Sequence, residues 1–312
     1  MTKNIAVTGA TGFVGKHLVR ALVTSGYQVR ALTRRPQKNS KNLIWIDGDL
    51  ENRIALEQLV SGVDVVFHLA GLIKAKKTSD FTRVNSHSVK TLVEILRKGP
   101  SNPHFILLSS LAAREPHLSS YANSKRHGED MLTANAANDM PWTILRPPGI
   151  YGPEDMETLK IFKSIAARMA PFPGGAHNRA SWIYAPDLAL AMIAVAGHKE
   201  CYGQILDVDD GAENGYSIDE MYQTAADILQ NKPFKFTVPK TALKIFGHTN
   251  VLFSTLFGYT PMLTPEKINE LCHPDWVCRG THVMDLTGWK PETNLKQGFN
   301  KTLKWYKENS LV

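Results

Sequence analysis

The stretch "TGATGFVG", residues 8–15, follows a run of apolar and β-branched residues and leads directly into an amphipathic segment. Its glycines, Gly9, Gly12 and Gly15, recur at every third position. Such a turn lets a pyrophosphate approach the backbone and points helix N–H groups at its negative charge. The spacing G-x-x-G-x-x-G departs from the ordinary dinucleotide fingerprint G-x-G-x-x-G. In this strand–turn–helix context it predicts a dinucleotide-binding fold, and the alternative is a glycine-rich turn that binds nothing.

Outward from this turn, short apolar runs alternate with amphipathic stretches. The predicted strands are 4–9, 28–32, 43–47, 63–70, 104–110 and 142–147. Apolar strands that alternate with helices are typical of a parallel sheet that is covered on both faces. We therefore expect an α/β fold with a doubly wound parallel sheet, that is, a Rossmann fold, over residues 1–150.

The composition changes after residue 147, where proline and glycine gather in loop-like segments and helices then dominate. The predicted helices are 156–169, 187–197, 217–230, 240–257, 264–272 and 295–309, with one more strand at 204–210. These elements predict a smaller, mostly helical substrate lobe over residues 151–312, from which elements at about 180–210 return to the sheet. We expect this lobe at the carboxyl edge of the sheet, where open α/β sheets bind ligands.

The overall composition narrows the class of partner. The 312 residues carry a formal net charge of +7 at pH 7, which favours anionic ligands such as nucleotide phosphates. The sequence has no long basic run and no basic–aromatic motif, so nucleic acid is not an expected partner. It also has no apolar signal segment and no run of about 18 apolar residues, so we expect a cytoplasmic protein without a transmembrane helix. Cys272, His273, Cys278 and His282 match no standard zinc spacing, so no metal site is predicted.

The end of the second predicted strand, "VRALTRRPQ" (29–37), bears on the choice of cofactor. NAD-binding folds place Asp or Glu here to hold the ribose 2′-hydroxyl, whereas Arg suits a 2′-phosphate. Thr33 stands at that position and Arg34 and Arg35 follow it. The pattern favours NADP(H) over NAD(H), and the alternative is that both arginines are solvated surface residues.

Several further motifs follow one another along the chain. They are "GDL" (48–50), "HLAG" (68–71), "VN" (84–85), "LLSS" (107–110), "YANSK" (121–125), "RPPGIYGP" (146–153), "WIYAPDLA" (182–189) and "GWKPETNLKQGF" (288–299). Together with the glycine turn, in this order, they resemble the extended short-chain dehydrogenase/reductase family of NAD(P)-dependent epimerase/dehydratase type. The resemblance covers nearly the whole chain. It is specific for the family but not for the substrate, because sugar epimerases, dehydratases, hydroxysteroid dehydrogenases and flavonol-type reductases share these motifs.

The resemblance implies an acid–base site. Tyr121 corresponds to the general acid–base, and Lys125 lowers its pKa and holds the nicotinamide ribose. The chemistry agrees, because a phenol with a pKa of about 10 is a poor base at neutral pH and a nearby cation favours its ionised form. Ser110 orients the substrate oxygen, although a shift of one residue in the correspondence would put Leu111 there. Asn85 either steadies this site or has a plain structural role.

The resemblance also implies a set of contacts. The cofactor contacts are Gly9, Thr11, Gly12, Phe13, Val14, Gly15, Arg34, Arg35, Asp49, Leu50, Leu69, Ala70, Gly71, Ser109, Tyr121, Lys125 and Pro147. Leu111 and Arg179 are weaker candidates on the substrate side. Helices around 80–98 and 121–138 pair two subunits in many members of this family, so a homodimer is an expectation from the resemblance alone.

Departures from the family pattern narrow the reaction. Dehydratases carry Thr-Asp-Glu where this chain has Ser110-Leu111-Ala112, which offers no acid for elimination. Tyr184 and Pro186 replace the His and Asp that are common in sugar-nucleotide enzymes. The favoured interpretation is an NADP(H)-dependent oxidoreductase that moves a hydride between nicotinamide and a secondary alcohol or ketone of a small, hydrophobic substrate. The alternatives are a nucleotide-sugar epimerase with retained NAD and a non-catalytic dinucleotide-binding accessory protein.

One segment, residues 241–263, is apolar for the surface of a lobe. Its side chains could line a pocket for a hydrophobic substrate, touch a membrane or pack as the core of the lobe. Core packing is the favoured expectation, because large apolar residues are most often buried.

Overall fold

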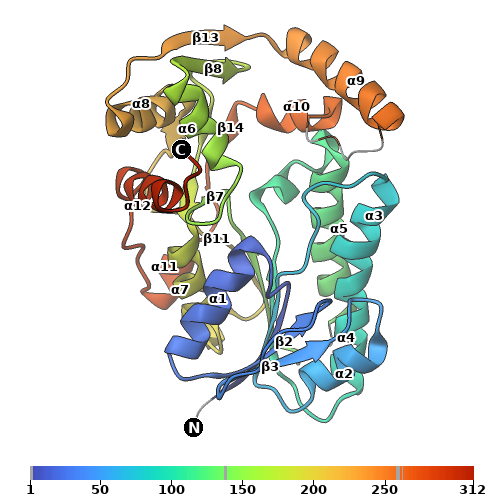
Figure 1. Cartoon of the computed structure of the whole chain (residues 1–312). Coiled ribbons are helices and arrows are strands. Elements are labelled where there is room, and N and C mark those ends of the chain that lie inside the picture. Colours follow the sequence, from blue (N-terminus) through green and yellow to red (C-terminus); the bar gives the residue numbers. More distant parts are fainter. Residues whose placement is uncertain (1–2, 137–138, 258–260, 262) are drawn as a thin grey trace.

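The computed structural model describes residues 3–136, 139–257, 261 and 263–312. Its centre is a seven-stranded sheet in which every neighbouring pair of strands is parallel (Figure 1). In spatial order the strands are β11 (Gln204–Asp207), β6 (Trp142–Arg146), β5 (His104–Leu108), β4 (Val65–His68), β1 (Asn4–Thr8), β2 (Gln28–Thr33) and β3 (Leu43–Asp47). The order reverses between β1 and β4, so a crevice opens there at the carboxyl ends of the strands.

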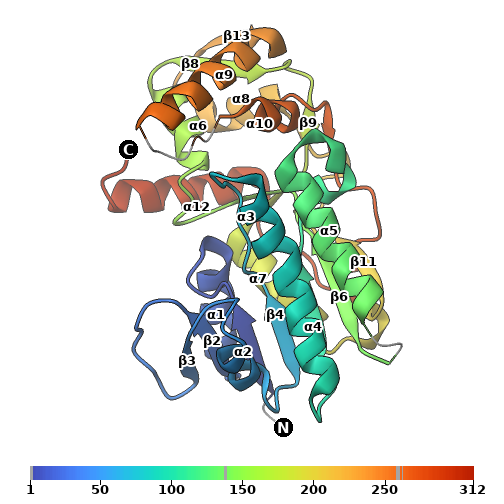
Figure 2. The same cartoon turned by 90° about the vertical axis from the view of Figure 1, so that its right-hand side faces the viewer.

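Helices cover both faces of this sheet, as Figures 1 and 2 show. One face carries α1 (Phe13–Thr24), α7 (Ala185–Val195) and α11 (Val283–Thr287), and the other carries α2 (Arg53–Val60), α4 (Ser88–Lys98) and α5 (Ser120–Asn135). Successive side chains of a strand point to opposite faces, and in β1 Ile5 and Val7 join the first layer while Ala6 joins the second. Burial on both faces explains the unbroken apolar strands, and the predicted doubly wound α/β fold is confirmed.

The remaining helices and short strands form a lobe above the carboxyl edge of the sheet (Figure 1). Its helices are α6 (Thr158–Ala166), α8 (Ile218–Leu229) and α12 (Leu295–Glu308). Its small sheets pair β7 (Gly149–Tyr151) with β10 (Trp182–Tyr184), β8 (Met169–Pro173) with β13 (Phe234–Val238), and β9 (Arg179–Ala180) with β12 (Tyr216–Ser217) and β14 (Asp275–Trp276). Aromatic rings fill its core, and those of Tyr151 and Phe299 meet edge to face with centroids 5.2 Å apart. The division of the chain near residue 150 stays a prediction.

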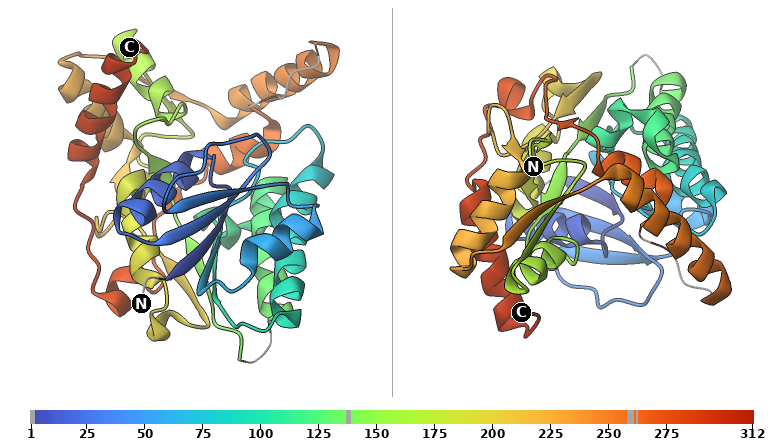
Figure 3. Two further views of the ribbon diagram at one scale, coloured as in Figure 1. Left: turned by 60° about the horizontal axis from the view of Figure 1, so that its bottom comes forward. Right: turned by 90° about the horizontal axis from the view of Figure 1, so that it is seen from above.

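Two further helices, α9 (Lys240–Phe257) and α10 (Pro265–Leu271), complete this end of the molecule. Figure 3 shows α9 reaching outward beyond the rest of the lobe. The expectation of core packing for residues 241–263 is wrong for several of its large side chains, because Ile245, Phe246, Phe253 and Phe257 are exposed. Residues 258–260 and 262 of that segment lie outside the described residues. Within the described residues no helix is long and apolar enough to cross a membrane.

Candidate active site

In the glycine turn between β1 and α1, neighbouring backbone segments come so close together that only glycine fits. Gly9 has a φ of +70°, and a Cβ on it would lie 2.6 Å from the backbone nitrogen of Ala70. A Cβ on Gly15 would lie 2.1 Å from the carbonyl oxygen of Gly9, so neither position admits a side chain. Gly12 heads α1 without a side-chain cap, which leaves the N–H groups of the first helical turn open to an anion. The turn therefore fits the pyrophosphate of a dinucleotide.

A cavity of about 700 Å³ extends from this turn across the switch point of the sheet. Of the residues predicted to bind cofactor, it is lined by Gly9, Thr11, Gly12, Arg34, Asp49, Leu50, Leu69, Ala70 and Gly71. Phe13, Val14 and Gly15 lie in the first turn of α1 beside it. The carboxylate of Asp49 accepts hydrogen bonds from the backbone N–H groups of Glu51 and Asn52, so this side chain also shapes the start of α2.

The two arginines after β2 stand at the outer end of this cavity. The hydroxyl of Thr33 donates to the carbonyl oxygen of Arg35 at 2.7 Å, which bends the chain and turns the next residues outward. Arg34 lines both this cavity and a neighbouring one, and Arg35 lines only the neighbouring one. Neither guanidinium takes part in an ion pair within the described residues. Two unneutralised cations at this place suit a ligand phosphate.

The predicted Ser110, Tyr121 and Lys125 come together at the carboxyl end of β5. Tyr121 lies in the first turn of α5, and it lines one cavity together with Ser110, which is near enough to influence the pKa of the phenol. Lys125 follows one turn later and donates from Nζ to the carbonyl oxygen of Leu108 at 3.0 Å. A Cβ placed on Gly71 would lie 3.2 Å from the Lys125 Nζ, so the amine faces the loop that closes the dinucleotide cavity.

The pKa of Tyr121 is shifted upward, whereas the sequence led us to expect that Lys125 would lower it. Burial raises the pKa of Tyr121 to about 12, a hydrogen bond from Ser110 opposes that rise and the Glu270 carboxylate adds to it. Burial lowers the pKa of Lys125 to about 8, against the attraction of Glu129. Desolvation of the phenol is the largest influence on its pKa. At neutral pH the Tyr121 phenol therefore carries its proton.

Asn85 has a positioning role that links the two halves of the site. It lies in a π-helical turn, Arg83–His87, and accepts from the N–H of Leu72 at 2.7 Å while donating to the Leu72 carbonyl at 3.0 Å. Its amide also donates to the hydroxyl of Ser124 on α5 at 2.9 Å. The loop after β4 is thereby fixed to the helix that carries Tyr121.

His68, part of the predicted "HLAG" segment, is a satisfied core residue. Ser88 donates to the carbonyl oxygen of Val84 at 2.6 Å, so its hydroxyl accepts from His68 Nε2. The other ring nitrogen, Nδ1, then accepts from the Thr8 hydroxyl at 2.7 Å. Burial and the neighbouring Lys125 lower the pKa of His68 to about 3, so it stays neutral and links β1, β4 and α4.

Two residues predicted to contact the cofactor, Ser109 and Pro147, form hydrogen bonds within the protein. The Ser109 hydroxyl donates to the buried carboxylate of Glu129 at 2.6 Å, and Arg146 holds the same carboxylate through Nε at 2.9 Å. The carbonyl oxygen of Pro147 accepts from the N–H of Leu111 at 2.9 Å. Ser109 thus points toward a structural ion pair, and contacts of Ser109 and Pro147 with cofactor stay predictions.

A second cavity, of about 450 Å³, meets the Ser110–Tyr121 pair from the side of the lobe. Most of its lining is apolar and comes from Leu111, Ala112, Pro148, Ile161, Pro173, Trp182, Ile218, Met221, Tyr222, Leu271 and Trp276. Arg179 also lines it, but its guanidinium donates to the carbonyl oxygens of Asn214 and Gly215 at 2.8 and 3.0 Å and contacts Glu220 at 3.3 Å. These contacts use Nε and Nη2, so the lobe's own backbone and Glu220 hold the Arg179 guanidinium in place.

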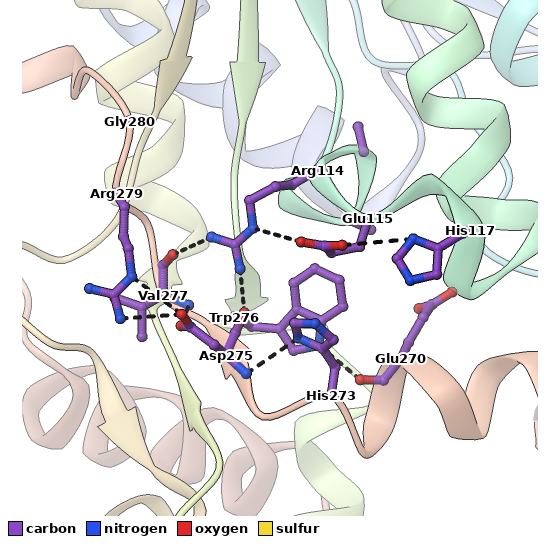
Figure 4. A network of polar contacts seen from close by, with 12 residues as sticks. Arg114, Glu115, His117, Glu270, His273, Asp275, Trp276, Val277, Arg279 and Gly280 are labelled. Carbon is purple, nitrogen blue, oxygen red and sulfur yellow. Dashed lines mark hydrogen bonds and ion pairs between the residues drawn. The ribbon is translucent and has the colours of Figure 1, made fainter.

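Arg114 is a residue that the sequence did not indicate (Figure 4). It follows the Ser110 turn and donates to the carbonyl oxygens of Val277, at 2.8 Å, and of Asp275, while its guanidinium lies 5.7 Å from the centre of the Trp276 ring. The bonds join positions up to 163 residues apart. They hold the β14 wall of the apolar cavity against the turn that carries Ser110.

A buried carboxylate stands on the other side of Tyr121. Glu270 on α10 accepts from the hydroxyl of Ser119 and pairs with Lys267, whose Nζ lies 2.6 Å from its Oε2 and 5.7 Å from the centre of the Tyr121 ring. A third cavity, of about 670 Å³, opens here between the loop at residues 73–78 and helices α9 and α10. It shares Tyr121, Lys267 and Glu270 with the apolar cavity, so two cavities converge on one phenol.

Comparison with known proteins settles the family. Residues 5–207 match the model of the NAD-dependent epimerase/dehydratase family. The chain belongs to this family. The predicted resemblance is thereby confirmed, and the protein is an NAD(P)-dependent enzyme of the oxidoreductase and epimerase class. Among the described residues no group of three or more His, Cys, Asp and Glu side chains is placed to hold a metal ion.

Members of the epimerase/dehydratase family resemble the chain over its full length. A ceramide reductase of Caulobacter vibrioides is 37% identical over 97% of this chain and 94% of its own. A UDP-glucose 4-epimerase of Vibrio cholerae is 25% identical over 97% of this chain and 95% of its own. The structure of a UDP-glucuronic acid 4-epimerase of Bacillus cereus with NAD superposes with a TM-score of 0.76 at 19% identity, covering 98% of this chain and 99% of that one. The last likeness establishes the fold alone.

Proposed function

We propose that this enzyme uses NADPH to reduce the ketone of a long-chain lipid to a secondary alcohol. The observation that carries the proposal is the apolar cavity that ends on the hydroxyls of Ser110 and Tyr121. Such a cavity suits a hydrophobic substrate with one polar group at the reacting end. A nicotinamide bound in the neighbouring groove would supply the hydride.

Ser110, Tyr121 and Lys125 each have a separate role in this reduction. Ser110 holds the ketone oxygen by a hydrogen bond, and Tyr121 donates its proton to that oxygen as negative charge develops there. Burial raises the pKa of the phenol to about 12, so at neutral pH it carries the proton that ketone reduction requires. Lys125 holds its cation beside the loop at Gly71, where a nicotinamide ribose would lie.

The choice of NADPH rests on the outer end of the groove. Thr33 offers no carboxylate to a ribose 2′-hydroxyl, and Arg34 and Arg35 present guanidinium groups that no acid neutralises in the described structure. A 2′-phosphate is the ligand group that these donors fit.

The substrate class follows from two observations. The relative with the printed name ceramide reductase is 37% identical over nearly the whole chain, which supports an N-acylated long-chain amino ketone as substrate. The ion pair of Arg179 with Glu220 offsets its positive charge, which disfavours the diphosphate of a nucleotide sugar. The second candidate, a nucleotide-sugar epimerase with retained NAD, draws its support from the relative of that name at 25% identity.

A pair of assays separates these functions. Purified protein is mixed with NADPH and an N-acyl long-chain 3-ketone in detergent micelles, and separately with UDP-glucose, with Tyr121→Phe as the inactive control. The proposal expects NADPH oxidation with the lipid ketone, its loss in Tyr121→Phe and no change in UDP-glucose. Interconversion of UDP-glucose and UDP-galactose without added cofactor would assign the epimerase function instead.

A further inference from the structure

Helix α9 carries a stripe of large aromatic side chains that the described residues leave exposed. Phe246, Phe253 and Phe257 are 64%, 52% and 74% exposed, and Ile245 beside them is 67% exposed. Steps of seven and four residues return to the same side of an α-helix, so the three phenylalanines form one line. The rings of Phe253 and Phe257 stack with centroids 6.1 Å apart. Exposed aromatic residues that lie together in this way indicate an interaction surface, whereas single exposed apolar residues are common on any protein.

A different side of α9 faces the protein. Gly247 is buried, and a Cβ on it would lie 2.7 Å from Cδ1 of Ile268 on α10. The helix therefore has an anchored side and an outward side, and the phenylalanine stripe is on the outward side. Figures 1 and 3 show α9 standing clear of the sheet domain, at the end of the molecule remote from β2 and α2.

The charged side chains of α9 itself have one sign, although α10 beside it carries Glu266 and Glu270. No Asp or Glu occurs from residue 236 to residue 265, whereas Lys240 and Lys244 lie near the start of the helix. Neither lysine takes part in an ion pair among the described residues. The exposed Lys74 and Lys77 lie in the loop before the short helix α3 (Thr78–Thr82), and Lys74 lines the same cavity as Val251 of α9. An aromatic stripe flanked by lysines is the pattern of a helix that lies in the interface of an anionic membrane.

We propose that α9 docks this protein on an anionic phospholipid bilayer. The stripe of Phe246, Phe253 and Phe257 enters the headgroup region, and the lysines remain among the lipid phosphates. No described helix spans a membrane, so the attachment lies along the surface. A second copy of the chain fits this face less well, because pairing two α9 helices would bring lysines of like charge together.

Docking in this way would place the entrance to the active site at the bilayer. The cavity between α9, α10 and the loop at Ile73 leads to Tyr121, and Ile73 itself is 62% exposed at its edge. A lipid ketone could then pass from the membrane to the phenol without crossing water. This consequence, though not the docking itself, rests on the proposed lipid substrate.

Vesicle co-sedimentation tests the docking. Wild type is spun with vesicles of phosphatidylcholine alone and of phosphatidylcholine with phosphatidylglycerol, beside Phe246→Glu/Phe253→Glu. Ile54→Glu is the matched control, because Ile54 is 69% exposed on α2 at the opposite end of the molecule (Figure 2). We expect binding to anionic vesicles that falls at least ten-fold in the double variant, is unchanged in the control and weakens in high salt. Lys240→Ala should lower it about five-fold.

Other outcomes would overturn the proposal. Equal binding of wild type and the double variant, or no binding of wild type to anionic vesicles, removes α9 as a membrane anchor. A lipid-free dimer that the double variant dissociates would assign the stripe to a second copy. Turnover of a short, water-soluble 3-ketone separates the two proposals: the double variant should keep it, and its absence from wild type would count against the reductase function while leaving the vesicle result intact.

Discussion

The Nζ of Lys125 lies 3.0 Å from the carbonyl oxygen of Leu108, the last residue of β5. This hydrogen bond connects the buried strand β5 to α5, the helix that carries Tyr121. It fixes the amine within the groove rather than leaving a long side chain free to move. The position of the Lys125 amine is therefore set by the protein's own backbone.

Removing the phenol should abolish proton donation without disturbing the fold. Tyr121→Phe keeps the ring against Phe81 and Lys267 and deletes only the hydroxyl. We expect kcat for ketone reduction to fall about 10²–10⁴-fold, with NADPH affinity and Tm nearly unchanged. Steady-state kinetics and a fluorescence titration of NADPH measure both effects. A variant that retains more than a tenth of the activity would show that another group supplies the proton.

The pH profile should report Lys125. Its pKa is lowered to about 8, so the amine is charged below that pH and neutral above it, while Tyr121, at about 12, stays protonated throughout. We expect kcat/KM for reduction to fall as the pH rises through about 8. In Lys125→Arg the charge persists, so the descending limb should move to higher pH. An unchanged limb in that variant would assign it to a different group.

The arginines after β2 should set the cofactor preference. Arg34→Ala/Arg35→Ala removes donors for a 2′-phosphate, and charge-assisted hydrogen bonds contribute about 1.5–3 kcal/mol each. Since both side chains are exposed, we expect the Kd of NADPH to rise about ten- to hundred-fold and that of NADH to stay constant. Lys38→Ala/Lys41→Ala, which removes the same charge outside the groove, is the control. An equal loss for both cofactors would argue against recognition of the 2′-phosphate.

The hydrogen bonds from Arg114 to the carbonyl oxygens of Asp275 and Val277 should contribute to both stability and substrate binding. Arg114→Ala leaves the carbonyl oxygens of Asp275 and Val277 without their partner, which costs about 1–3 kcal/mol in the free energy of unfolding. It also loosens the Trp276 wall, so KM should rise more than kcat falls. Arg279→Ala, which removes only an exposed ion pair to Asp275 (Figure 4), should change stability by less than about 1 kcal/mol. Equal effects in denaturant unfolding of the two variants would contradict a special role for Arg114.

The parts of the fold that the sequence predicts are those with local signals. The glycine turn and the apolar strands owe their pattern to neighbouring residues, and Ile5, Ala6 and Val7 are apolar because both faces of β1 are covered. Arg114 had no such signal, since its carbonyl partners lie more than 160 residues away. The pKa of Tyr121 depends on burial by the lobe and on Glu270, which no local motif encodes.

Helix α9 illustrates a different limit. Its length and bounds follow from the sequence pattern. The spacing of Phe246, Phe253 and Phe257 predicts one apolar side of the helix, but it does not show whether another helix, a bilayer or a partner covers that side. Only the position of the neighbouring elements shows which side faces outward. Exposure of that side is a property of the tertiary structure and not of the helix.

The placement of β11 has a consequence for synthesis of the chain. When the first 150 residues have left the ribosome, six of the seven strands exist, but β11 and α7 do not. The edge of β6 is then unpaired, and the sheet face that Leu188 and Met192 of α7 later cover is bare. Such an intermediate exposes both an open strand edge and an apolar surface, which are the features that recruit chaperones or lead to aggregation. Completion of the sheet must therefore wait until the segment from β7 to α7 has been translated.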